Sequence, residues 1–266
     1  MTTATATNKI PLAVARRVAA KLIAHLTPYC ERIEVAGSIR RGKPEVGDIE
    51  LVAISRTEER VIGGQLGLFG KTQQGEVERV SLLDQALERM IEARHITREG
   101  PKSQRAWGPR MKKFWLQLSP LMGLAKVDLF ITRPECWGPI MVIRTGPADF
   151  SRDLVMHIAA HTPYRQQDGV LVHEATGQVI PVPTEEAYFE YAGVLFIPPE
   201  RRTVQELKRA IARWVHPRPA REPARPVRIP GGIVYTTDAD VRRQIRARLE
   251  QRAGLSGVSF ETPDEG

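Results

Sequence analysis

Apolar residues recur every four positions near the start of the chain and predict a helix over residues 11–26. The residues that would share one helix face are Val14, Val18, Leu22 and Leu26. A proline at the first position suits a helix start. Two short runs at 33–35 and 49–54 are apolar or β-branched and predict strands on either side of a glycine-containing turn. A further helix is expected from about residue 81 to 93.

The middle of the chain continues this alternation of strands and helices. The run FWLQL at 114–118 and the run AKVDLFIT at 125–132 predict strands, and a single acid, Asp128, interrupts the second one. Residues 150–215 then alternate helical and turn signals, with Thr184 as an N-cap and Gly193 as a C-terminal stop for one helix. We therefore expect a second, smaller subdomain in this region.

Three segments have the composition of loops, linkers or surface helices. Residues 63–76 are rich in glycine and glutamine and predict a mobile loop, whose apolar residues would be a partner site or fold onto the body. The apolar residues are Leu66, Leu68 and Phe69. Prolines alternate with arginines over 217–230, which favours an extended basic linker. Beyond it, Thr237 would cap a basic C-terminal helix.

Composition narrows the classes of function. The 266 residues include 39 Lys and Arg against 31 Asp and Glu, a formal charge of +8, which favours a polyanionic partner such as nucleic acid. Cys30 and Cys136 are too few and too far apart to indicate a disulfide framework or a zinc site. Because no stretch approaches the apolar length of a membrane span, we expect a cytoplasmic protein without a membrane partner. It is also expected to be a monomer.

Two acids follow a basic turn in the segment AGSIRRGKPEVGDIELVAI, residues 36–54. Asp48 and Glu50 are two positions apart, so in a strand they point to the same face, which is costly without a cation between them. Oxygen ligands select Mg²⁺ or Mn²⁺ over zinc. A third acid on a neighbouring strand would complete a site for two ions, and Asp128 is the candidate.

The turn ahead of these acids has the residues of a phosphate-binding loop. Its glycines allow close backbone approach, Ser38 offers a hydroxyl, and Arg40 or Arg41 can form paired hydrogen bonds with phosphate oxygens. Alone, such a loop is more often a solvated turn, and an acid pair is more often an exposed strand edge. Their direct succession, with a buried-looking acid on a later strand, instead predicts phosphoryl or nucleotidyl transfer.

A basic segment at 102–113 predicts a nucleic-acid contact at the tip of a hairpin. Its cations are Lys102, Arg105, Arg110, Lys112 and Lys113. Trp107 stands beside a Gly-Pro turn within it, where the indole would either stack on a base or pack within the turn.

Taken together, the motifs GSIRRG, GDIE, KVDLF and IRTGPADF resemble the palm of family X DNA polymerases, in the polymerase beta superfamily of nucleotidyltransferases. The likeness covers about residues 9–202, because TEEAYFEYAGVLFIPPERR resembles the end of that family's thumb. It implies an α+β fold. The expected parts are a palm at 1–148 with a mixed sheet and helices on one face, a small α/β thumb-like subdomain at 149–216, and a basic extension at 217–266.

The resemblance also implies roles for individual residues. Asp48, Glu50 and Asp128 would bind two Mg²⁺ or Mn²⁺ ions, and Asp128 would activate the primer 3′-hydroxyl. The residues expected to hold the triphosphate are Gly37, Ser38, Arg41 and Gly47, with Lys9 at its outer phosphate. Lys126 falls at a primer-phosphate position.

Thr145 and Gly146 match the family's turn beneath the incoming sugar, but three features depart from its pattern. Glu50 stands where the family usually has aspartate, and Ile143 and Arg144 replace an aromatic pair. The family's N-terminal lyase and helix-hairpin-helix domains have no counterpart, so a minimal form is expected.

The implied reaction is addition of dNTPs to a DNA primer–template, with gap filling in repair as the first expectation. Two alternatives remain. One is a template-independent terminal transferase or other nucleotidyltransferase. The other is a nucleic-acid-binding protein with a degenerate site.

Overall fold

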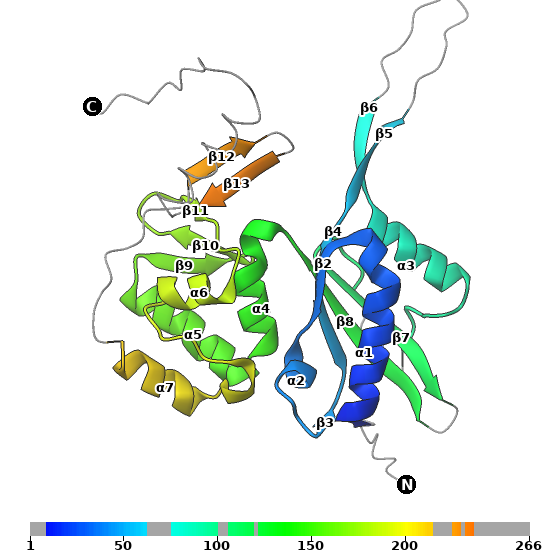
Figure 1. The fold of residues 1–266 in the computed structure, drawn as a ribbon, viewed down its shortest axis with the longest axis horizontal. Helices are drawn as coiled ribbons and strands as arrows, with labels where there is room; N and C mark the ends of the chain where they lie inside the picture. Colours follow the sequence, from blue (N-terminus) through cyan, green and yellow to red (C-terminus); the bar gives the residue numbers. More distant parts are fainter. Residues whose placement is uncertain are drawn as a thin grey trace, which may run out of the picture.

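A four-stranded mixed sheet forms the centre of the first of two units in this α+β protein (Figure 1). The computed structural model describes residues 9–62, 76–100, 106–119, 122–214, 225–229 and 232–236. The strands, in sheet order, are β2 (Cys30–Val35), β4 (Ile49–Ser55), β8 (Gly123–Thr132) and β7 (Met111–Ser119). The two central strands, β4 and β8, run parallel, whereas both outer pairs are antiparallel. The predicted strands are all present.

Two helices cover one face of this sheet. They are α1 (Leu12–Leu26) and α3 (Leu82–Glu92). These confirm the helices predicted over residues 11–26 and from about 81 to 93. Ser81 caps α3 by accepting a hydrogen bond from the backbone N–H of Asp84 at 3.0 Å. Ile49, Leu51 and their neighbours on β8 pack against the helices in a shared core, because alternate residues of each strand face them.

The opposite face of the sheet is also partly covered, which corrects the expectation of helices on one face only. Helix α4 (Trp137–Thr145) packs there through Trp137 and Met141 against Val52, Ile54 and Phe130. The short 3₁₀ turn η2 (Pro134–Cys136) leads into α4 directly from β8. A sequence with apolar residues on both sides of its central strands needs cover on both faces.

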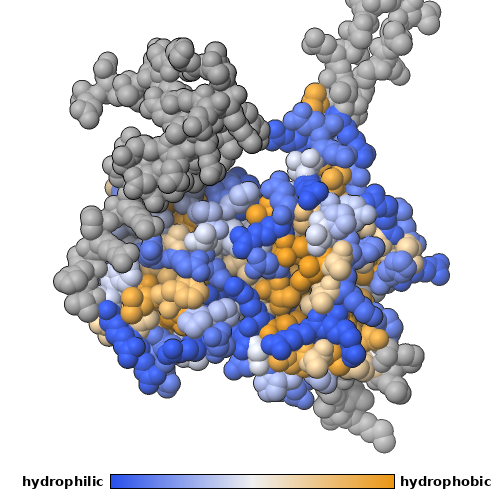
Figure 2. All heavy atoms as spheres, in the orientation of Figure 1, coloured by the Kyte–Doolittle hydropathy of each residue, from blue (hydrophilic) through white to orange (hydrophobic). Residues whose placement is uncertain are grey.

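The second unit has its own core, which begins within α4 at Val142 and continues to Ala210. Its elements are α5 (Ala148–His161), α6 (Glu185–Tyr191), α7 (Val204–Ala212), β9 (Tyr164–Gln167), β10 (Val170–His173), β11 (Val179–Ile180) and the 3₁₀ turn η3 (Pro199–Arg201). Thr184 caps α6, and Gly193 follows it at φ +66°, as predicted. In Figure 2, apolar residues show in the middle of each unit with polar residues around them.

Three two-stranded ribbons complete the described chain. They are β1 (Ile10–Pro11) with β3 (Glu45–Val46), β5 (Thr57–Ile62) with β6 (Glu76–Ser81), and β12 (Arg225–Ile229) with β13 (Gly232–Thr236). The short helix α2 (Gly37–Arg40) and the 3₁₀ turn η1 (Thr27–Tyr29) lie next to β2. In Figure 1 the β5–β6 ribbon projects from the body.

Part of the expected linker at 217–230 is a strand instead. Residues 225–229 pair with β13, and Pro226 stands opposite Tyr235. A two-stranded ribbon consists of edge strands only, where proline is tolerated, and the β-branched residues around it favour a strand. The loop residues 63–75 with Leu66, Leu68 and Phe69, and the C-terminal helix predicted after Thr237, lie outside the described residues. No helix in the described part of the chain has the length and apolar character needed to cross a bilayer.

Candidate functional site

The three predicted acids meet at the centre of the main sheet. Glu50 on β4 lies directly beside Asp128 on the parallel strand β8, and Asp48 comes just before β4. The residues alternating with them, such as Ile49 and Val127, belong to the core under α1 and α3. The acids therefore share the opposite face, as the spacing of Asp48 and Glu50 predicted.

Lys126 lies between two of these acids. Its Nζ atom is 2.7 Å from Oδ2 of Asp48 and 3.1 Å from Oδ2 of Asp128. Burial would lower the pKa of Lys126, but hydrogen bonds and attraction from the two carboxylates raise it above its ordinary value. The lysine expected at a primer phosphate is thus a charged member of the acid cluster.

The cluster still holds more negative charge than its neighbours compensate. Burial, followed by repulsion from Asp48 and Asp128, raises the pKa of Glu50 to about 7, although Arg41 and Arg144 act in the other direction. Oδ1 of Asp128 is buried and has no hydrogen-bond partner among the described residues. An uncompensated acceptor next to a destabilised carboxylate indicates a place for an added cation or proton donor.

Replacement of Glu50 by glutamine should change the stability of the protein in a way that depends on pH. The pKa of Glu50 is raised from 4.5 to about 7, so the Glu50 carboxyl group holds its proton more tightly in the folded protein than in the unfolded chain. The stability of the wild-type protein therefore falls as pH rises through that range. In EDTA, we expect the variant to be more stable than wild type by about 1–2 kcal/mol near pH 8 and equally stable near pH 4. Urea unfolding at both pH values measures this. A difference that does not change with pH would contradict it, and Glu200→Gln, at an exposed glutamate, is the control.

The predicted phosphate-binding turn is a single helical turn, α2, rather than an open loop. Gly37 opens it at φ +61°, and a Cβ atom there would lie only 1.8 Å from Oε2 of Glu50. Glycine is therefore required both by the backbone angle and by the packing of Glu50 against it. A Cβ atom on Gly47 would meet nothing within 4 Å, so Gly47 leaves open space just ahead of Asp48. Ser38 is half-buried in α2.

Arg40, the last residue of α2, and Arg41, its C-cap, have different partners. Arg40 donates from Nη1 and Nη2 to the two carboxylate oxygens of Glu185, at 2.9 and 2.6 Å, and from Nη1 to Oγ1 of Thr145 at 3.2 Å. Arg41 donates to the carbonyl oxygen of Thr145 and is attracted to Glu50 and Asp48. Arg40 therefore anchors α2 to the second unit, and Arg41 is the arginine that lies near the acids.

Thr145 and Gly146, the pair predicted to lie beneath the sugar, are at the C-terminal end of α4, where Thr145 contacts Arg40 and Arg41. Thr145 is fully buried, with its hydroxyl and carbonyl oxygens both engaged by these arginines. A Cβ atom on Gly146 would lie 2.6 Å from Cδ1 of Phe150 and 2.7 Å from Oγ of Ser151. Packing alone also accounts for both residue types, because Thr145 is buried against the two arginines and Gly146 has no space for a side chain.

Lys9 is placed at the edge of this region by the β1–β3 pair. That pairing sets Ile10 opposite Val46, immediately before Gly47. Lys9 forms an exposed ion pair with Glu45 at 3.8 Å. Such a pair is weakly held and leaves the lysine free to exchange partners.

The basic segment does form a hairpin turn, but its cations differ in access. Arg105 lies outside the described residues, and Arg110 pairs with Asp168 of the second unit at 3.1 Å, with both side chains exposed. Lys112 is only 5% exposed and bonds Oδ2 of Asp84 at 3.0 Å, so it is not available to a phosphate, contrary to expectation. Lys112 pairs in register with Leu129, a core residue, and so lies on the sheet face that the helices cover. Lys113 pairs in register with Asp128 and lies on the face of the acids.

Trp107 packs within the protein at this hairpin. Its indole N–H donates to Oε1 of Glu88 at 3.1 Å, and the guanidinium of Arg98 lies 4.2 Å from its ring centroid. Of the two roles that the sequence left open, the structure shows the packing one.

Two functional features were not predicted from the sequence. Arg144, at the end of α4, stacks on Phe130 at 3.9 Å and is attracted to Glu50 and Asp128. Glu185 is buried between Arg40 and Arg202, whose Nη1 lies 2.8 Å from Oε1 of Glu185. The sequence held a clue for Arg144 only. Phe130, on which Arg144 stacks, is two positions from Asp128 in the same strand and therefore lies on the face of the acids. Nothing local marks Glu185 as a buried ion.

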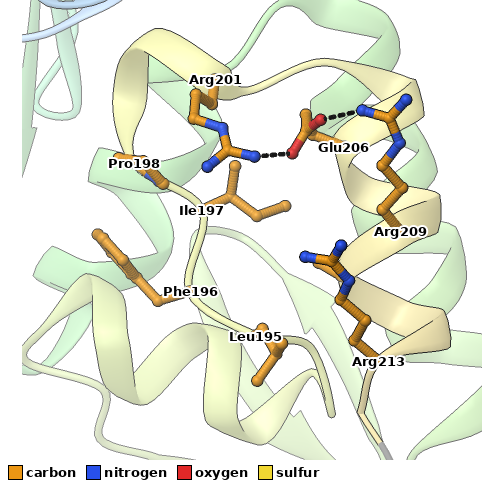
Figure 3. A pocket seen from close by; sticks show the side chains of 9 residues that line it. Leu195, Phe196, Ile197, Pro198, Arg201, Glu206, Arg209 and Arg213 are labelled. Carbon is orange, nitrogen blue, oxygen red and sulfur yellow. Dashed lines mark hydrogen bonds and ion pairs between the residues drawn. The ribbon is translucent and has the colours of Figure 1, made fainter.

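A separate hollow of about 90 Å³ lies in the second unit, between residues 195–198 and α7 (Figure 3). Arg201 and Arg209 on its rim both pair with Glu206, at 2.6 and 2.5 Å. Its lining belongs to residues 195–213, so the hollow is distinct from the acid cluster.

Within the described residues, no three His, Cys, Asp or Glu side chains are arranged so that they could hold a metal ion. The ammonium of Lys126, rather than a further acid, lies within ion-pair distance of both Asp48 and Asp128. No protein-family model and no curated protein matches the sequence. Interpretation of the site therefore depends on its own geometry.

Proposed function

We propose that this protein is a metal-dependent nucleotidyltransferase of the family X DNA polymerase type, which adds dNTPs to a DNA primer. The observation that carries the proposal is the side-by-side register of Glu50 and Asp128, with Asp48 on the same face. Three acids that lie 2 to 80 positions apart in sequence are thereby collected at one point beside the glycine–arginine segment of α2. Charge concentrated in this way needs a cationic partner.

The side chains of Asp48, Glu50 and Asp128 are of the chemical type that Mg²⁺ or Mn²⁺ prefers as ligands. All three offer hard oxygen donors, and the buried Oδ1 of Asp128 lacks a partner that a cation would supply. Burial and then repulsion from Asp48 and Asp128 raise the pKa of Glu50, and an added cation would offset both effects. Two such ions, when bound, would neutralise charge on the triphosphate and on the attacking and leaving oxygens.

The remaining steps are assigned to residues of this chain. Arg41, Ser38 and Lys9 would bind the triphosphate, since Arg41 already lies near the acids and Lys9 has only a weak exposed partner. Asp128 would accept the proton of the primer 3′-hydroxyl at Oδ1, its free acceptor. The 3′-oxygen then bonds the α-phosphorus while the bond to the β-phosphate oxygen breaks, and pyrophosphate leaves.

Nucleic acid is the substrate that the charge favours. The chain carries a formal charge of +8, and exposed Arg110 lies on the hairpin next to β7, the strand that pairs with Asp128. Binding through such cations weakens as salt rises, because the release of counterions into a more concentrated solution gains less entropy. Arg110 and Lys113 therefore remain the proposed contacts, without Lys112.

The test is extension of a labelled primer presented alone, on an open template and across a short gap. Each substrate is incubated with Mg²⁺, Mn²⁺ or EDTA, and with dNTPs or NTPs. Template-directed extension that requires a metal supports the proposal. Metal-dependent tailing of the unpaired primer would assign the same chemistry to a terminal transferase. Absence of incorporation in every arm, with DNA binding intact, would refute nucleotidyl transfer and leave a nucleic-acid-binding protein.

A further inference from the structure

The ammonium of Lys126 stands where a metal ion would have to bind. It contacts Oδ2 of Asp48 at 2.7 Å and Oδ2 of Asp128 at 3.1 Å, so it links the acid just before β4 to the acid on β8. The side chain is 30% exposed, compared with 11% for that of Asp128. The lysine is thus the more accessible of these two side chains, whereas Oδ1 of Asp128 is buried and has no hydrogen-bond partner among the described residues.

A divalent cation and this ammonium cannot both hold the same two oxygens. A metal ligated by Asp48 and Asp128 would sit about 2 Å from each oxygen, within the space of the ammonium. Two positive groups in contact also repel strongly at a partly buried site. Lysine has a flexible four-carbon stem, so Lys126 can withdraw without movement of β8.

If Lys126 withdraws, its ammonium group loses its two carboxylate partners, so another anion would have to neutralise it. The other acid of the cluster, Glu50, already has Arg41 and Arg144 near it. An anion arriving from solvent next to Asp48 and Asp128 would be repelled unless Lys126 turned toward it. A nucleic-acid phosphate is such an anion under the proposed function, on which this step rests.

From this geometry we infer that Lys126 is an internal counter-ion that competes with the divalent metal for Asp48 and Asp128, and that a nucleic-acid phosphate relieves the competition by drawing the ammonium away. Metal and nucleic acid then bind with positive coupling, and each raises the affinity for the other by the same factor. Metal affinity is low until nucleic acid is present. Lys126 is a positioning residue here, because it acts through the acids.

The test is Mn²⁺ binding measured by loss of the free-ion EPR signal, without any turnover. Lys126→Met keeps the length of the side chain and removes its charge. We expect it to bind Mn²⁺ roughly tenfold more tightly than wild type without nucleic acid, because the competitor is gone. Lys21→Met, at an exposed lysine on α1, is the control for the change of one unit in net charge, and its affinity should match wild type.

A second arm repeats the titration with a saturating short duplex that has a recessed 3′-end, after subtraction of Mn²⁺ bound by the duplex alone. The duplex should tighten Mn²⁺ binding by wild type and Lys21→Met several-fold, and should change Lys126→Met much less. Weaker or equal Mn²⁺ binding by Lys126→Met without duplex would overturn the competition. Equal tightening in all three proteins would overturn the relief by phosphate.

These outcomes are separable from failure of the proposed function. A protein that never binds duplex fails the polymerase proposal, yet the metal-only arm still decides whether Lys126 competes. Lack of Mn²⁺ binding in wild type and in Lys126→Met alike would overturn both. Lys126→Arg serves as a second variant, since it keeps the charge and should retain weak metal binding and its coupling to duplex.

Discussion

Replacement of Asp128 by asparagine will slow nucleotide addition by about a thousandfold or more. Asparagine has nearly the same shape, so the strand pairing of Asp128 with Glu50 is kept. The substitution removes a carboxylate charge from the cluster and puts a neutral amide where Oδ1 would accept the primer proton. Single-turnover extension of a primer on an open template, at saturating dNTP, measures the loss.

A matched control separates this effect from a general loss of charge. Asp168→Asn makes the same chemical change at an exposed residue that pairs with Arg110. Asp168 has φ 51°, a conformation that asparagine also adopts readily. It should therefore extend primers at nearly the wild-type rate. If Asp128→Asn retained more than about a tenth of that rate, Asp128 could not have the role assigned to it.

The largest effect on stability is expected for Glu185→Gln. Glu185 lies within hydrogen-bond distance of both Arg40 and Arg202, and Arg202 is 1% exposed. Removal of the acid leaves a buried guanidinium without its counter-charge, which costs about 3–5 kcal/mol. Urea unfolding near neutral pH measures the change. Because Arg40 also anchors α2, the KM for dNTP should rise as well.

The effect of Glu185→Gln should depend on pH. Burial alone would raise the pKa of Glu185, but the hydrogen bond from Arg40 and the charges of Arg202 and Arg40 lower it below its ordinary 4.5. Its stabilising contribution is therefore present above pH 4.5 and lost as pH falls through the lower folded value. The gap between variant and wild type should close in acid. Glu186→Gln, at the exposed neighbour, should change stability by less than about 0.5 kcal/mol at any pH.

Local patterns were sufficient to predict most elements of the main sheet and the shared face of two acids. The four-residue period marked α1, and the apolar runs marked β4 and β8. Two-residue spacing correctly put Asp48 and Glu50 on one side because strand alternation is a purely local property. The parallel register that puts Asp128 beside Glu50 is not local. The sequence offered Asp128 only as a candidate third acid on a neighbouring strand, and the resemblance implied the same role.

The errors share a physical origin. Lys112 was expected at the surface, and Arg40 was considered for phosphate binding, but each has a distant acid as partner, Asp84 and Glu185 respectively. Whether a charged side chain is buried depends on such long-range partners, which a sequence window does not contain. The same holds for Pro226, whose strand pairing depends on β13.

The parallel pairing of β4 with β8 also has a consequence for folding. All of β5, β6, α3 and β7 lies between these two strands in the chain, so their pairing closes a long loop. Contacts of this kind form slowly, because the entropy of loop closure is lost before the strands stabilise each other. The antiparallel pairs β2–β4 and β7–β8 have short connections and can form first. The acid cluster is thus assembled late, and repulsion between Glu50 and Asp128 opposes the very step that joins the two halves of the sheet.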